Sequence, residues 1–129
     1  MALYLDSSAI VKLVVRETES TALRRFLRTH PVRVSSALAR IEVLRAVRGH
    51  GEAARERARD VLKRLVLLAI DDRVIEQAAG LDGRVLRSLD AIHGASALQL
   101  GDEIVALVTY DERMQDAARA MGIPMESPA

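Results

Sequence analysis

Four acidic residues, Asp6, Glu42, Asp90 and Asp111, stand at positions where their carboxylates could meet in a folded chain. Asp6 ends a short apolar segment at the N-terminus, and Asp111 follows shortly after another apolar segment. Several carboxylates in one place repel one another and take up protons unless a divalent cation lies between them. Oxygen ligands without Cys or His favour Mg²⁺ or Mn²⁺, which activate water and stabilise charge on a phosphodiester. The pattern indicates metal-dependent phosphodiester hydrolysis.

Each acid on its own also has a structural explanation. Asp6 and Asp111 could cap the helices that follow them, and Asp90 could complement the dipole of a helix that starts nearby. Glu42 falls in the middle of a predicted helix, where Arg45 is its polar neighbour and potential surface partner. The metal-site interpretation is favoured because Asp6 and Asp111 follow two separate strands, and open α/β sheets place their chemistry at the carboxyl ends of strands.

Composition excludes several other kinds of site. The chain has 129 residues, no cysteine and 3 histidines, which excludes disulfides, thiolate chemistry and a histidine-rich metal site. His93, one turn after Asp90, is interpreted as a hydrogen-bonding or packing residue. Only 2% of the residues are aromatic, so binding of nucleic acid by base stacking is not expected. No apolar run is long enough for a bilayer and no signal peptide is evident, which predicts a cytoplasmic protein without a membrane partner.

Basic residues are grouped in two segments, 24–28 and 55–64, although the net charge is only +1. In one interpretation they form solvated helix faces, paired with acids such as Glu52, Glu56 and Asp60. In the other they contact RNA phosphates. The sequence leaves both interpretations open.

Short apolar segments alternate with segments of helical periodicity, which predicts a parallel sheet with helices on both faces. No linker or repeat interrupts this pattern, so residues 1–129 are expected to form one α/β domain. Ser7 or Ser8 is expected to cap the first helix, and Asp71 or Asp72 a later one. Strands are predicted at 3–6, 32–35, 65–70, 103–109 and 123–126, and helices after Ser8 and at 20–29, 37–48, 52–64, 73–80, 88–100 and 112–121.

Four stretches that carry these acids resemble PIN-domain proteins, specifically the VapC toxins of bacterial and archaeal toxin–antitoxin pairs. They are LDSSAIVKL (5–13), VSSALARIEV (34–43), LRSLDAIH (86–93) and VTYDERM (108–114). They stand in the family's order and at its usual separations, and they span nearly the whole chain. Each motif alone has low specificity, whereas the four together are highly specific.

The resemblance implies a fold, an activity and partners. The fold is a three-layer α/β/α sandwich with a five-stranded parallel sheet in the order 3-2-1-4-5. The activity is that of a Mg²⁺- or Mn²⁺-dependent endoribonuclease acting as a toxin on RNA. The protein is expected to be a homodimer, and a cognate VapB-like antitoxin is expected to inhibit it by laying its tail across the active site.

The resemblance also assigns residues. The metal-binding and catalytic acids of the family fall on Asp6, Glu42, Asp90 and Asp111. Ser8 and Thr109 match hydroxyl positions near the metal, and are expected to be supporting residues. Asp116 either fills the place of a further acid found in some relatives or is a surface residue. Gly94 departs from the larger apolar residue of many relatives, which concerns packing rather than the acids.

Two alternatives come from other classes of protein. A phosphorelay receiver domain has a similar size and α/β alternation, but it needs paired acids after the first strand and a lysine late in the chain. This chain has Asp6-Ser7-Ser8 at the first place, and its only lysines are Lys12 and Lys63. The second alternative is a catalytically silent PIN module that only binds partners, and the presence of all four acids disfavours it.

Overall fold

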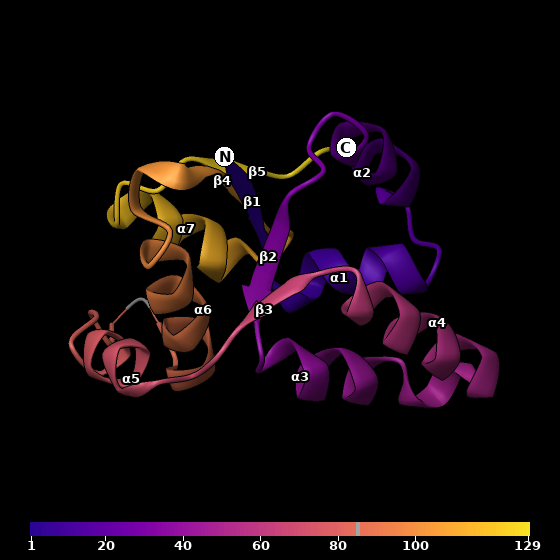
Figure 1. Cartoon of the computed structure of the whole chain (residues 1–129), viewed down its shortest axis with the longest axis horizontal. Helices are drawn as coiled ribbons and strands as arrows, with labels where there is room; N and C mark the ends of the chain where they lie inside the picture. The colour runs from indigo at the N-terminus through magenta and orange to yellow at the C-terminus, as the bar shows by residue number, and fades with distance from the viewer. Residues whose placement is uncertain (85) are drawn as a thin grey trace.

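The centre of the molecule is a five-stranded sheet (Figure 1), in a computed structural model that describes residues 1–84 and 86–129. The strand order is β3-β2-β1-β4-β5, and every neighbouring pair is parallel. The predicted topology is therefore confirmed. The strands are β1 (Ala2–Leu5), β2 (Arg33–Ser36), β3 (Val66–Leu68), β4 (Ile104–Val108) and β5 (Met125–Glu126).

Helices cover both faces of this sheet. Figure 1 shows α1 to α4 on one side and α5 to α7 on the other, which confirms the three-layer sandwich. None of the helices in the described residues is both long and apolar enough to cross a membrane. The helices are α1 (Ser7–Val14), α2 (Ser20–Leu27), α3 (Ala39–Ala46), α4 (Glu52–Lys63), α5 (Asp72–Ala79), α6 (Ser88–Leu98) and α7 (Glu112–Ala120), with 3₁₀ turns η1 (Arg48–His50) and η2 (Gly101–Glu103).

The central strand β1 is buried on both faces. Its successive side chains point to opposite sides of the sheet, as the pleat requires. Leu3 and Leu5 pack into the core that faces α1 to α4, while Ala2 and Tyr4 pack into the core that faces α6 and α7. A parallel strand covered on both faces reads as an unbroken apolar run, which is why this segment was recognisable in the sequence.

The start of the first helix differs from the prediction. Asp6, not Ser7 or Ser8, caps α1, because its carboxylate accepts a hydrogen bond of 3.1 Å from the backbone N–H of Ala9. The strand therefore ends at Leu5, and Asp6 is the first residue beyond it. At α5 the predicted cap is confirmed, since Asp71 accepts from the N–H of Val74 at 3.0 Å.

Several other elements are shorter than predicted, among them β5, which is Met125–Glu126 instead of 123–126. Two of them have a clear structural reason. The strand predicted at 65–70 is confined to Val66–Leu68, because its neighbour β2 ends at Ser36, which pairs with Leu68. The helix predicted at 37–48 begins at Ala39, after a turn in which Ser36 Oγ accepts from the N–H of Leu38 at 3.1 Å.

The departure at Gly94 is explained by close packing of α6. A Cβ atom at this position would lie 3.0 Å from Cε of Met121, so a larger residue would require Met121 to move.

Candidate active site

Asp6 and Thr109 lie side by side at the carboxyl ends of the central strands β1 and β4. Leu5 is in register with Val108, and the N–H of Asp6 donates to the carbonyl of Val108 at 3.2 Å. The Thr109 hydroxyl donates to Oδ2 of Asp6, and Ser8 Oγ donates to Oδ1 at 2.6 Å. Both predicted hydroxyl residues, Ser8 and Thr109, therefore bind the carboxylate of Asp6.

The same two hydroxyls connect Asp6 to the segment that carries Asp111. Ser8 Oγ accepts from the N–H of Tyr110 at 2.9 Å, and Thr109 Oγ1 accepts from the N–H of Asp111 at 3.1 Å. Asp111 itself caps α7 by accepting from the N–H of Arg113 at 2.9 Å. The capping role that the sequence raised for these acids is present, and it positions their carboxylates at the shared end of the sheet.

Asp6 is a buried carboxyl group, with 5% of its surface exposed. Burial raises the pKa of Asp6 above its ordinary value, although hydrogen bonds from Ser8, Thr109 and the backbone N–H of Ala9 act in the opposite direction. An ionised carboxylate at this depth is costly unless a positive charge compensates it. Asp6 therefore has the character expected of a cation ligand.

Asp90 lies in the first turn of α6 and is electrostatically coupled to Asp111. Burial raises the pKa of Asp90, and the negative charge of Asp111 raises it further. The charge of Arg113 opposes this effect, as does a backbone hydrogen bond from Arg87. The carboxylate of Asp111 is thus close enough to disfavour the ionisation of Asp90, an arrangement that a divalent cation would stabilise.

Glu42 on α3 is bound by two side chains that are distant in sequence. Its Oε1 atom accepts from Ser7 Oγ at 2.7 Å and lies 2.7 Å from Nε2 of His93. Burial acts to raise the pKa of Glu42, but the hydrogen bonds from His93 and Ser7 outweigh it and hold the pKa below its ordinary value. Glu42 therefore carries its charge inside the site, and Arg45 is not its partner.

A model of the PIN domain family matches residues 3–120 of the chain. The chain belongs to this family. Ribonuclease VapC46 of Mycobacterium tuberculosis is 56% identical over 128 residues, with 99% of this chain and 98% of the relative covered. Ribonuclease VapC47 of the same species is 39% identical over 131 residues, with 98% and 96% covered. Within the PIN domains, the chain groups with the VapC ribonucleases.

Solved structures of PIN domains from toxin–antitoxin systems have the same fold. VapC20 of Mycobacterium tuberculosis, described as a sarcin–ricin loop cleaving toxin, superposes with a TM-score of 0.78 at 19% identity, covering 98% of this chain and 99% of that one. A toxin–antitoxin complex from Klebsiella pneumoniae gives 0.74 at 22% identity, covering 100% and 98%. At these identities the likeness concerns the fold alone.

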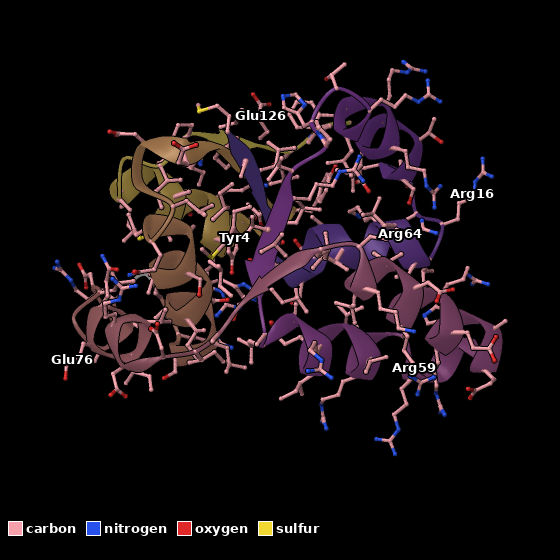
Figure 2. All side chains as sticks on the ribbon, in the orientation of Figure 1. Tyr4, Arg16, Arg59, Arg64, Glu76 and Glu126 are labelled. Atoms are coloured by element: carbon pink, nitrogen blue, oxygen red, sulfur yellow. The ribbon has the colours of Figure 1, made fainter. Side chains whose placement is uncertain are left out.

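His93 of this PIN domain is a hydrogen-bonding residue, as predicted. It is 4% exposed, and its Nδ1 atom lies 2.8 Å from the hydroxyl of Tyr4. Tyr4 belongs to β1 and is labelled near the centre of the molecule in Figure 2. Sequence reasoning missed Tyr4 and Ser7 as part of the site. For Ser7 the signal available was its place inside the first PIN motif, next to Asp6; Tyr4 had no such signal.

The acids of this PIN domain are linked in pairs. Asp6 connects to Asp111 through Thr109, and Asp90 is coupled to Asp111 by charge. Across residues 1–84 and 86–129, no three His, Asp or Glu side chains come together as a complete metal-binding group.

Asp116 lies apart from these acids. It is on α7 with 69% of its side chain exposed, and it forms an ion pair of 3.2 Å with Arg119. These are the contacts of a surface residue, which was one of the two interpretations that the sequence left open.

The two basic segments are partly occupied by structural contacts. Arg24 donates to the carbonyl of Leu13 at 3.2 Å, and Arg57 donates to that of Val14 at 3.3 Å, so both serve the C-terminal end of α1. On α4, Glu52 lies 3.4 Å from Arg55 and 3.6 Å from Arg59. Arg59 and Arg64 mark this region in Figure 2. Pairing with acids thus accounts for some of the basic residues, and phosphate contact by the others stays a prediction.

Proposed function

We propose that this PIN domain is a Mg²⁺- or Mn²⁺-dependent endoribonuclease that acts in the cytoplasm as a VapC-type toxin. The observation that carries the proposal is that the Thr109 hydroxyl joins the carboxylate of Asp6 to the backbone N–H of Asp111 at the carboxyl ends of two adjacent strands. Asp90 adds a third carboxylate that is coupled to Asp111. The relatives named as ribonucleases support the reaction class.

The residues at this place suit a hard divalent cation. Asp6, Asp90 and Asp111 offer carboxylate oxygens, and burial disfavours the uncompensated charge of Asp6 and Asp90. We assign these three residues as ligands, with Glu42 bordering the ion. When bound, such a metal activates water and stabilises the charge that develops on the phosphodiester.

The protein contributes orientation around this metal. Ser8 and Thr109 hold the two oxygens of Asp6 in place, and Thr109 also fixes the backbone at Asp111. Neither hydroxyl is needed as a nucleophile in this scheme, because the attacking group is water. Their role is to position the ligands, and they belong to the site as supporting residues.

The proposed substrate is single-stranded or loop RNA. A site at the edge of a sheet admits a splayed backbone more readily than a rigid duplex. With so few aromatic residues, the affinity is expected to depend on contacts to phosphate rather than on base stacking. Cleavage rates should therefore fall as the salt concentration rises.

The test is a cleavage assay with the purified chain, free of any partner, on a single-stranded RNA, the matching duplex and total cellular RNA. We expect cleavage of the single strand in Mg²⁺ or Mn²⁺, none in EDTA, and poor cleavage in Ca²⁺, which polarises water less. Cleavage that persists in EDTA would show that the nuclease does not use these acids. Binding without cleavage under all conditions would identify a catalytically silent PIN module.

We further propose that the chain forms a homodimer and binds a cognate VapB-like antitoxin. The support for an antitoxin partner is the fold that this chain shares with a chain of the toxin–antitoxin complex from Klebsiella pneumoniae. A basic side chain of the antitoxin is expected to lie beside the acids, because a nearby positive charge compensates their repulsion.

Co-expression with the small protein encoded next to this chain should give one complex in size-exclusion chromatography. The complex is expected to cleave RNA far more slowly than the free chain. Separate elution of the two proteins would contradict the assignment of that partner.

A further inference from the structure

A row of hydrogen bonds links four elements of the fold through buried and half-buried side chains. Tyr4 on β1 bonds to Nδ1 of His93 on α6 at 2.8 Å, and Nε2 of His93 bonds to Glu42 on α3 at 2.7 Å. Ser7 on α1 reaches the same Glu42 oxygen at 2.7 Å. Tyr4 and His93 are both almost fully buried. The row therefore sets the position of Glu42 from inside the molecule.

The hydrogen-bond pattern favours one placement of the proton on a neutral His93. Ionised Glu42 can only accept hydrogen bonds, so Nε2 of His93 must carry a proton to bond to it. The Tyr4 hydroxyl stays protonated, because burial raises its pKa. Its oxygen lies 2.8 Å from Nδ1 of His93, and when the ring is neutral with its proton on Nε2, the hydroxyl donates to Nδ1. Tyr4 thus favours the Nε2–H tautomer of His93, which is the tautomer that Glu42 needs.

Both donors bind the same oxygen of Glu42. Ser7 and His93 each contact Oε1, and no hydrogen bond to Oε2 is found among the described residues. A carboxylate held at one oxygen by two donors cannot rotate freely about its terminal bond. Its other oxygen keeps lone pairs that are available to a cation.

We propose that Tyr4 and His93 are positioning residues that set the carboxylate of Glu42 for metal binding. The inference rests on the proposed function, since it assumes that Glu42 borders the metal. It goes further in assigning roles to Tyr4 and His93, which touch neither the metal nor the RNA in this scheme. Groups that hold a ligand in this way commonly change metal affinity or activity by about 10- to 100-fold when they are replaced.

The test measures Mn²⁺ binding by the full-length chain without RNA, from the electron paramagnetic resonance signal of free Mn²⁺. His93→Leu is expected to weaken binding by about 10- to 100-fold. His93→Gln retains an N–H donor near the position of Nε2, so it should recover most of the lost affinity. His50→Leu, a change at an exposed histidine on η1, is the matched control and should leave binding unchanged.

A double-mutant comparison separates positioning from a general loss of structure. In a Glu42→Gln background, His93→Leu should cause no further loss of Mn²⁺ affinity, because the group it positions is already changed. An equal loss in both backgrounds would overturn the positioning role and leave the metal site intact. If Glu42→Gln alone alters neither Mn²⁺ binding nor cleavage, the assignment of Glu42 in the proposed function fails together with this inference.

The role of Tyr4 has a spectroscopic test that does not depend on metal. In the metal-free chain, the ring ¹⁵N shifts of His93 should report the Nε2–H tautomer, and Tyr4→Phe should shift the population away from it. The same variant should weaken Mn²⁺ binding by less than His93→Leu does. Unchanged ¹⁵N shifts and unchanged Mn²⁺ affinity in Tyr4→Phe would overturn the inference, even if His93→Leu does not fold.

Discussion

Asp111→Asn is expected to abolish RNA cleavage while the metal-free chain keeps its fold. The asparagine oxygen can still accept the hydrogen bond that Asp111 receives from the N–H of Arg113 at 2.9 Å, so α7 keeps its cap. What is lost is the negative charge that binds the cation. Because replacing groups that only support a ligand costs about 10- to 100-fold, loss of a direct ligand should reduce the rate by more than about 100-fold. Initial cleavage rates and thermal melts of the same preparations measure both effects.

The same helix supplies a matched control. Asp116→Asn also removes one negative charge from α7, but this side chain is 69% exposed and paired with Arg119. It should leave the cleavage rate within about 2-fold of wild type, as expected for a surface substitution away from the site. Equal losses of cleavage rate in Asp111→Asn and Asp116→Asn would mean that the net charge of α7 matters. Such a result would contradict the assignment of Asp111 as a metal ligand.

The sheet order was predictable, and the four acids could be proposed as a site, because both leave strong signals in the sequence. Strands buried on two faces are continuous apolar runs, and the acids stand inside four motifs at the spacing of a known family. The positions of Asp6 and Asp111 after separate strands have a simple physical meaning, since parallel strands end at one edge. These features depend on the local sequence and on chain topology alone.

The contacts around Glu42 were not predictable in the same way. Ser7 is 35 positions from Glu42, and His93 is 51 positions from it. A lone serine or tyrosine has no periodicity that would indicate its partner, and the exposed Arg45 was the nearer candidate by helix geometry. Only the packing of α6 and α3 at the same end of the sheet brings these groups together.

The boundary at Asp6 shows a second limit. From the sequence, Asp6 could be either the last residue of the strand or the cap of the helix that follows. The apolar run is followed by Asp-Ser-Ser, so three residues are potential helix caps. Asp6 caps the helix because its carboxylate also receives the hydroxyl groups of Ser8 and Thr109, which no helix rule describes. One side chain thus ends the strand, starts the helix and faces the proposed metal.

Asp6→Asn is expected to raise the melting temperature of the metal-free chain at pH 7. Burial raises the pKa of Asp6, so the folded state favours the protonated carboxyl group. That contribution to stability is complete below the unfolded pKa of about 3.9 and is lost as the pH rises through the higher folded pKa. At neutral pH the buried charge therefore destabilises the fold, and a neutral amide removes this cost. Asp6→Ala should instead lower stability by about 0.5–2 kcal/mol, because it also loses the helix cap.

Saturating Mn²⁺ should make the wild-type chain melt at a higher temperature than Asp6→Asn, the reverse of the order expected without metal. A ligand present at 100 times its dissociation constant stabilises the native state by about 2.7 kcal/mol. Asp6→Asn gains less, because it lacks the negative charge and therefore binds Mn²⁺ more weakly than the wild-type chain does. For a domain of this size that stabilisation corresponds to an upward shift of roughly 5–20 °C in the wild-type chain. Calorimetric scans at pH 7 in EDTA and in Mn²⁺ measure the crossing, and the difference in EDTA should shrink as the pH is lowered toward 4. If the wild-type chain is the more stable one in EDTA, or remains the less stable one in saturating Mn²⁺, Asp6 acts as a helix cap and is not a metal ligand.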